Sequence, residues 1–309
     1  MALHIETPLV ESLPLSTAAG RTVVLKLDAL QPSGSFKTRG IGALCEAHAR
    51  GGVRRFVSSS GGNAGMAVAY AGRRLGLPVT VVVPATTTER AIRRIRDEGA
   101  DVVVHGDTWL EAHAHAAGLT GPRDALIHPF DEPRIWAGHA TMIDEVARTS
   151  ARPDAIVVSV GGGGLLCGVI EGLRRNGWND VRVVAVETRG AESLHRSLEE
   201  NTRVTLPAIT SVATSLGAKQ VCERAFDLAR DRERNGTLTS VVVTDAAAVA
   251  ACLRFVDDHR LVVEPACGAA LALAYDAHPA LTTARRVLIV VCGGATVGID
   301  QLKRWEKER

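Results

Sequence analysis

The chain has 309 residues, 46% of them hydrophobic and only 4% aromatic, which allows one large or two smaller domains with an aliphatic core. The 36 Lys and Arg residues against 34 Asp and Glu give a net charge of +2, so bulk charge argues against nucleic acid or an anionic membrane as partner. The N-terminus lacks the features of a secretory signal, no segment has the length of an apolar membrane span, and the six cysteines are scattered. These features predict reduced thiols in a cytoplasmic protein.

Short Val-rich runs alternate with Ala-rich helical patterns along the chain. In chain order we expect a strand at 54–60, a helix at 63–75, a strand at 77–84, a helix at 87–100 and a strand at 101–106. The later half repeats the pattern, with strands at 155–160, 181–187 and 287–292 and a helix at 165–175. Continuous β-branched runs between helices are typical of parallel strands buried on both faces. The sequence therefore predicts an α/β fold with two open, mostly parallel twisted sheets flanked by helices.

Three glycine turns follow predicted strands, where ligands of open parallel sheets collect: SSSGGNAG (58–65), GGGG (161–164) and CGGATVG (292–298). The run of four glycines would expose backbone N–H groups at a helix N-terminus, which suits a phosphate; a tight strand–helix turn is the alternative. The first turn adds hydroxyls and the amide of Asn63, for which a plain helix N-cap is the alternative.

The stretch PSGSFKTRG (32–40) places Lys37 in a tight loop. A single lysine is usually a surface charge, but beside two anion-binding turns it can be a Schiff-base nucleophile. Pyridoxal phosphate carries both an aldehyde for a lysine and a phosphate for a glycine turn. The combination indicates this cofactor.

Four motifs in this order, PSGSFKTRG, SSGGNAGMA, SVGGGGLLCG and VVCGGATV, resemble those of the fold type II (tryptophan synthase β-like) pyridoxal-phosphate enzymes, specifically the L-serine/L-threonine dehydratase branch. The similarity runs nearly end to end and includes PFDEPRIWAGHATM (129–142) and FVDDHRLVVEPACGAAL (255–271). The resemblance implies a lyase of amino-acid catabolism. It would deaminate L-serine or L-threonine by β-elimination to pyruvate or 2-oxobutanoate plus ammonia.

The resemblance also implies cofactor contacts. Lys37 would hold the cofactor as a Schiff base and, once freed, act as the general base. Phe36 would pack beside the ring, and Asn63 would hydrogen-bond its 3′-oxygen. The phosphate would lie on the backbone N–H groups of Gly161, Gly162, Gly163 and Gly164. Cys292 would face the pyridine nitrogen, where a neutral thiol cannot hold a positive charge, which suits prompt β-elimination.

The substrate carboxylate would bind the loop of Ser60, Gly61 and Asn63. At the position of Gly61, serine racemases carry serine as a second base and dehydratases commonly carry alanine. Glycine cannot transfer a proton, and the missing methyl is expected to loosen the pocket and to alter turnover and the preference between serine and threonine. Racemisation or another β-elimination on this fold, and a cofactor-binding protein with little turnover, stay open as alternatives.

Further expectations follow from the resemblance. Glu187 and the carbonyl groups of Ala191, Leu216 and Ala218 match segments that coordinate K⁺ in relatives. We expect a homodimer, whose protomer has a large domain (1–34 and 140–309) and a small inserted domain (35–139) that closes on the substrate. The chain ends soon after the last motif, so we expect no appended regulatory domain. His113 and His115 are expected to be packing or solvent residues.

Overall fold

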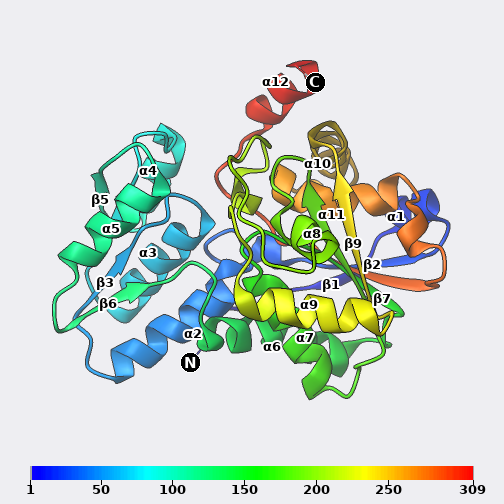
Figure 1. Cartoon of the computed structure of the whole chain (residues 1–309), viewed down its shortest axis with the longest axis horizontal. Coiled ribbons are helices and arrows are strands. Elements are labelled where there is room, and N and C mark those ends of the chain that lie inside the picture. The colour runs from blue at the N-terminus through cyan, green and yellow to red at the C-terminus, as the bar shows by residue number, and fades with distance from the viewer. Residues whose placement is uncertain (1, 309) are drawn as a thin grey trace. The chain divides into compact units, whose positions relative to one another are not determined.

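The structure is a computed structural model that describes residues 2–308 (Figure 1). The chain divides into two compact units. The smaller unit consists of Gln31–His139 with the N-terminal residues up to Ile5, and the larger unit consists of Glu6–Leu30 with the chain from Ala140 onward. Residues 2–5 and 31–34, expected in the large domain, thus group with the smaller unit.

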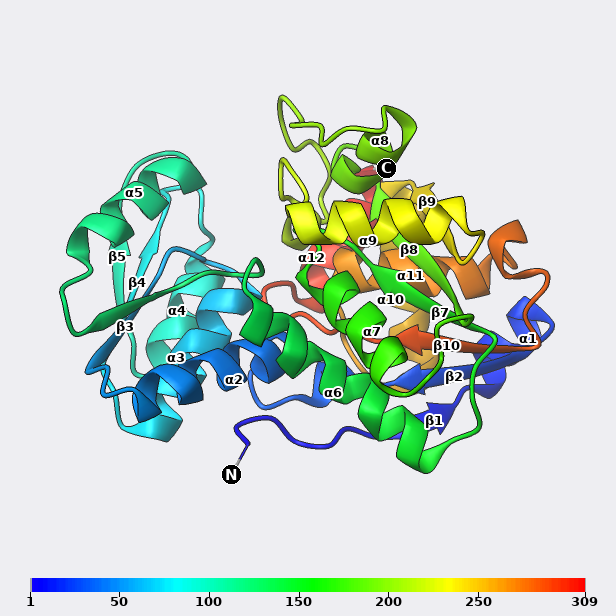
Figure 2. The same ribbon diagram turned by 60° about the horizontal axis from the view of Figure 1, so that its bottom comes forward.

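Within the described residues, the smaller unit contains a four-stranded parallel sheet in the order β5–β4–β3–β6. Helix α5 covers one face, and α2, α3 and α4 cover the other (Figure 2). Because it is covered on both faces, the central run VTVVV of β4 is entirely buried, as the apolar pattern predicts. The elements are α2 (Lys37–Arg50), β3 (Arg55–Ser58), α3 (Asn63–Leu75), β4 (Val79–Val83), α4 (Glu89–Asp97), β5 (Asp101–Val104), α5 (Trp109–Leu119) and β6 (Asp124–Ile127).

The described part of the larger unit contains a six-stranded sheet in the order β1–β2–β10–β7–β8–β9, which can be followed in Figure 2. Only the edge strand β1 of this sheet runs antiparallel to its neighbour. Helices α7 (Gly164–Arg175) and α9 (Glu223–Arg234) lie on one face, and α10 (Asp245–His259) and α11 (Pro265–Tyr275) lie on the other (Figures 1 and 2). The strands are β1 (Leu9–Glu11), β2 (Thr22–Lys26), β7 (Ala155–Ser159), β8 (Arg182–Thr188), β9 (Leu238–Val243) and β10 (Arg286–Val290).

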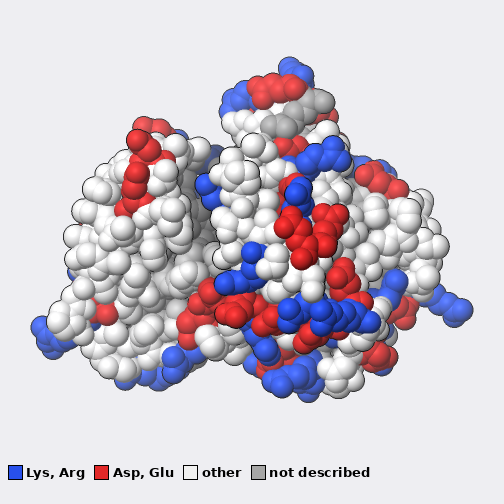
Figure 3. Space-filling model, viewed as in Figure 1, with Lys and Arg blue, Asp and Glu red and all other residues white. Residues whose placement is uncertain are grey.

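The remaining helices complete the chain. They are α1 (Leu13–Ala19), α6 (Pro133–Thr149), α8 (Ser193–Glu199) and α12 (Ile299–Glu308). Short 3₁₀ turns lie at Asp28–Leu30, Thr214–Leu216 and Pro279–Leu281. Among the described helices, none is both long and apolar enough to cross a membrane. On the face shown in Figure 3, acidic and basic side chains are interleaved over α9.

The two sheets confirm the predicted α/β class with open, mostly parallel sheets. The three glycine turns lie where predicted, after the carboxyl ends of β3, β7 and β10. The predicted strands run past the observed ones by up to two residues, because the chain leaves the sheet as the following turn approaches. For example, β10 ends at Val290, two residues before the end of the predicted strand at 292.

Candidate active site

Lys37 is the first residue of α2 in the smaller unit. Its Nζ donates a hydrogen bond to the carbonyl oxygen of Pro129 at 2.6 Å and lies 5.2 Å from the centroid of the Phe36 ring. The loop before it is held by the Ser33 and Thr38 hydroxyls, which are 2.6 Å apart, and Gly34 has φ 82°. The turn around Lys37 therefore fixes the point on the backbone from which its amine-bearing side chain extends.

The first turn of α2 is unfavourable for cations. It contains Lys37 and the fully buried Arg39 but no acidic residue. Positive charge at a helix N-terminus opposes the helix dipole, at a cost of about 0.3–1 kcal/mol per charge. A local rule that is broken in this way is most often found at a functional site.

His139 packs behind Lys37 within the smaller unit. Its ring is 0% exposed and lies 4.9 Å from the Phe36 ring, and within the described residues neither ring nitrogen has a hydrogen-bond partner. Burial, followed by the charges of Lys37 and Arg39, holds the pKa of His139 well below its usual value. A neutral imidazole therefore backs Phe36, and no spacing in the sequence pointed to it.

The loop after β3 brings Ser60, Gly61 and Asn63 together in the smaller unit. Asn63 is the first residue of α3 and is 8% exposed, whereas Gly62 is the N-cap and provides no side-chain cap. The alternative prediction that Asn63 caps the helix is therefore wrong. A side chain at Gly65 would collide with the carbonyl oxygen of Ser60, which explains the glycine there.

His113 contacts this loop from α5. Its Nδ1 lies 2.9 Å from the hydroxyl oxygen of Ser59, and its ring stacks on Trp109 with centroids 4.8 Å apart. The ring of His115 instead stacks on His105, at 4.0 Å. The two histidines therefore pack separately, as their spacing predicted, but His113 reaches a loop next to predicted site residues.

The glycine turn after β7, in the larger unit, forms a row of amide groups at the N-terminus of α7. The N-cap Gly163 has φ 93°, and a side chain at Gly161 would lie 2.9 Å from the Cα of Leu216. Within residues 2–308, the N–H groups of 161–164 have no hydrogen-bond acceptor. Free N–H groups in a turn that side chains would obstruct fit the phosphate of pyridoxal phosphate.

Cys292 follows β10 and is buried beside a second thiol. A hydrogen bond with Cys267, and then burial, raise its pKa well above the usual value. Glu264, which is 3% exposed, also contributes to this shift and accepts a hydrogen bond of 2.7 Å from Thr296. The thiol of Cys292 is therefore neutral at physiological pH, as the sequence interpretation required. Cys267 and Glu264 were missed because they come from a different element.

Glu187, in the predicted cation site, is the last residue but one of β8 and is fully buried. Its two carboxyl oxygens accept the N–H groups of Leu194 and His195 at 2.9 and 2.7 Å. Burial raises its pKa to about 8, against the lowering effect of these hydrogen bonds. Ala191 and Leu216 are buried, and Ala218 is half-buried. The carboxyl group of Glu187 thus already accepts hydrogen bonds from the first turn of α8. Within the described residues, no group of three acidic, His or Cys side chains could hold a metal ion.

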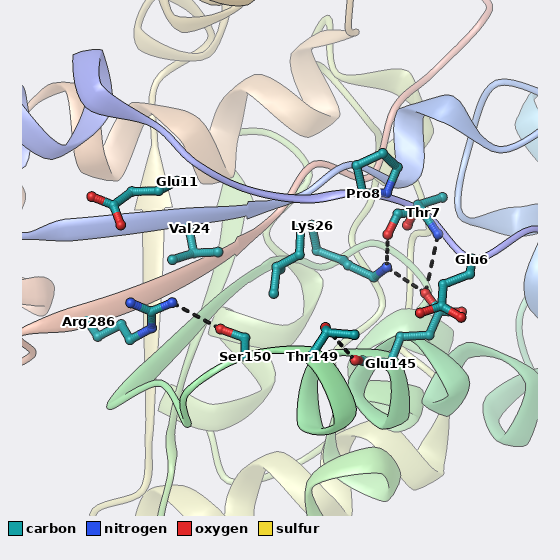
Figure 4. Close-up of a pocket in the computed structure, with 11 residues that line it drawn as sticks. Glu6, Thr7, Pro8, Glu11, Val24, Lys26, Glu145, Thr149, Ser150 and Arg286 are labelled. Atoms are coloured by element: carbon teal, nitrogen blue, oxygen red, sulfur yellow. Dashed lines mark hydrogen bonds and ion pairs between the residues drawn. The ribbon is translucent and has the colours of Figure 1, made fainter.

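A separate polar cavity of about 540 Å³ lies in the larger unit (Figure 4). None of the predicted site residues lines it. Lys26 Nζ donates to Glu145 Oε2 at 2.5 Å and to the carbonyl oxygen of Thr7 at 2.6 Å, and Arg286 donates to the Ser150 hydroxyl at 2.9 Å. Lys26 and Arg286 therefore each donate to another residue of the wall. The lining residues are Glu6, Thr7, Pro8, Leu9, Glu11, Val24, Lys26, Glu145, Thr149, Ser150 and Arg286.

Known proteins resemble this chain along nearly its whole length. The family model described as pyridoxal-phosphate dependent enzyme matches residues 2–293. An L-serine dehydratase/L-threonine deaminase of Mus musculus is 49% identical over 313 residues, 98% of this chain and 94% of that protein. A serine dehydratase-like protein of the same organism is 47% identical over 97% of this chain and 93% of its own length. The crystal structure of a fungal L-serine ammonia-lyase from Rhizomucor miehei superposes with a TM-score of 0.92 at 36% identity, covering 100% and 99% of the two chains.

Proposed function

Because the chain belongs to the family of pyridoxal-phosphate dependent enzymes, we propose that it is an ammonia-lyase that deaminates L-serine and L-threonine. The observation that carries the proposal is the 49% identity to an L-serine dehydratase/L-threonine deaminase over 98% of the chain. The products would be ammonia and pyruvate from L-serine, or ammonia and 2-oxobutanoate from L-threonine.

The cofactor contacts follow from the residues. Lys37 would be the covalent anchor, and the free N–H groups of the turn at 161–164 would hold the phosphate. Phe36 would lie beside the ring, Asn63 would donate to its 3′-oxygen, and the neutral thiol of Cys292 would face its nitrogen without charging it. When bound, pyridoxal phosphate supplies an aldehyde that takes up amines and a ring that withdraws electrons.

The chain's own groups would carry the remaining chemistry. The loop of Ser60, Gly61 and Asn63 would bind the substrate carboxylate at the N-terminus of α3, where the helix dipole favours an anion. Lys37 Nζ would remove the proton from the substrate Cα. The electron pair of that bond forms the Cα–Cβ double bond while the Cβ–hydroxyl bond breaks. The hydroxyl takes up one proton as it leaves, which balances the proton removed from Cα, so that the step releases one water. Hydrolysis of the resulting enamine then gives the oxo acid and ammonia.

Purified protein supplied with pyridoxal phosphate tests the proposal directly. Oxo acid should form from L-serine or L-threonine and not from their D-isomers. Lys37→Ala should abolish it, while Lys303→Ala, at an exposed position of α12, should not. A change of chirality without oxo acid would instead indicate a racemase, and neither product would indicate a binding protein.

We also propose that the protein works in the cytoplasm as a homodimer and that Glu187 with the carbonyl groups of Ala191, Leu216 and Ala218 binds K⁺. Six buried free thiols suit a reducing compartment. Light scattering during size exclusion would test the dimer. Equal dehydratase activity in sodium and potassium buffers would reject the cation site.

A further inference from the structure

The side chain of Thr87 stands directly against the bare Cα of Gly61. A Cβ atom built on Gly61 would lie 2.6 Å from Thr87 Cγ2, 2.8 Å from Thr87 Oγ1 and 3.2 Å from Val83 Cγ1. All three distances are shorter than ordinary van der Waals contact. The space left by the missing methyl at 61 is therefore filled, and our expectation of a loosened pocket is wrong.

The loop that carries Thr87 is anchored at both ends. It follows β4, and Ala85 and Thr87 donate their N–H groups to the carbonyl oxygens of Gly106 and Pro84, at 2.8 and 3.0 Å. The next residue, Thr88, caps α4 by accepting the N–H of Ala91 at 3.3 Å. Backbone and cap thus hold Thr87 in place next to Gly61.

The hydroxyl of Thr87 has no hydrogen-bond partner among the residues that the structure describes, and the side chain is half-buried. The side chain therefore faces Gly61 with both its methyl and its hydroxyl. No polar interaction within the protein explains why it points there.

We infer that Gly61 and Thr87 form a complementary pair in which Thr87, instead of a side chain at 61, forms the wall that sets the preference between L-serine and L-threonine. This inference rests on the proposed function, in which the loop binds the substrate carboxylate. The Cβ of an amino acid is only two bonds from its carboxylate carbon, so its substituents lie close to whatever borders that loop. L-Threonine differs from L-serine by one methyl at this carbon.

Kinetics of three Thr87 variants would test the wall. One methyl in a snug pocket changes kcat/KM about 10- to 200-fold. Thr87→Ser, which removes the methyl and keeps the hydroxyl, should raise the ratio of kcat/KM for L-threonine over L-serine at least about tenfold. Thr87→Val, which keeps the shape, should leave the ratio within about twofold, and so should Thr86→Ala at the exposed neighbouring position.

A double-mutant cycle adds a readout that does not depend on turnover. Gly61→Ala should lower the thermal midpoint of the full chain by about 2–6 °C, as overpacking does, and Thr87→Ala in the same chain should restore most of this loss. The inference would be overturned if the wild-type protein is active but Thr87→Ser leaves the substrate ratio unchanged. It would also be overturned if the midpoint shifts of Gly61→Ala and Thr87→Ala are additive in the double variant. A wild-type protein without oxo acid production would overturn the proposed function itself, and the specificity assignment with it.

Discussion

Replacing Gly163 by alanine perturbs the proposed phosphate turn at a single atom. Gly163 has φ 93°, and a side chain in the left-handed region costs about 1–2 kcal/mol. The new Cβ would also overlap the Cβ of Ala225 and approach Val221 Cγ2 to 3.0 Å and Cys222 Sγ to 3.3 Å. Overpacking of this kind costs about 1–3 kcal/mol. The free energy of unfolding should therefore fall by about 2–5 kcal/mol.

Gly177 provides a matched control for this substitution. It also has positive φ, 69°, but nothing lies within 4 Å of a Cβ built there. In urea unfolding of the cofactor-free chain, Gly177→Ala should therefore lower the free energy of unfolding only by the backbone cost of positive φ, about 1–2 kcal/mol. In an absorbance titration, Gly163→Ala should raise the Kd for pyridoxal phosphate at least about tenfold, and Gly177→Ala should leave it unchanged. Equal losses in the two variants, in both assays, would refute this account of the turn.

Three further predictions concern buried titratable groups. Glu145→Gln should cost about 3–5 kcal/mol of unfolding free energy in urea, because it replaces the buried carboxylate that forms an ion pair with Lys26, which is 1% exposed; a loss below about 1 kcal/mol would contradict this. With the pKa of Glu187 raised to about 8 from 4.5, stability should fall as pH rises from about 4.5 through 8, by at most about 1.4 kcal/mol per pH unit. Glu187→Gln should remove that fall in pH-dependent urea unfolding, and K⁺ should stabilise the wild type more at pH 9 than at pH 6, since only the ionised carboxylate binds it. Because the pKa of the Cys292 thiol is raised, mass spectrometry should find it unalkylated after iodoacetamide treatment of the native protein at pH 8, and rapid labelling would contradict its burial as a neutral thiol.

Local signals were sufficient for much of the fold. The helix predicted at 63–75 has the bounds of α3, because a glycine cluster precedes it and Gly76, in the left-handed conformation, ends it. The buried parallel strands were equally predictable, since short Val-rich runs are typical of strands covered on both faces. Motif resemblance, not periodicity, supplied the role proposed for Lys37.

Contacts between residues far apart in the sequence could not be predicted from local sequence patterns. Thr87 lies beside Gly61 because β3 and β4 are parallel neighbours, so the loops that follow them start at the same edge of the sheet. No local sequence pattern encodes which side chain occupies the space that a methyl group at position 61 would take. The pairing of Cys292 with Cys267 likewise depends on how α11 packs on the larger sheet. The cap of α3 was mispredicted because an asparagine beside glycines is a common N-cap, whereas here the chain enters the helix one residue earlier.

Borohydride reduction of the purified protein loaded with pyridoxal phosphate tests the central claim most directly. Peptide mass spectrometry should then find the phosphopyridoxyl group on Lys37, with no adduct at that peptide in Lys37→Ala. Absence of an adduct on Lys37, or its presence only on another lysine, would contradict the account.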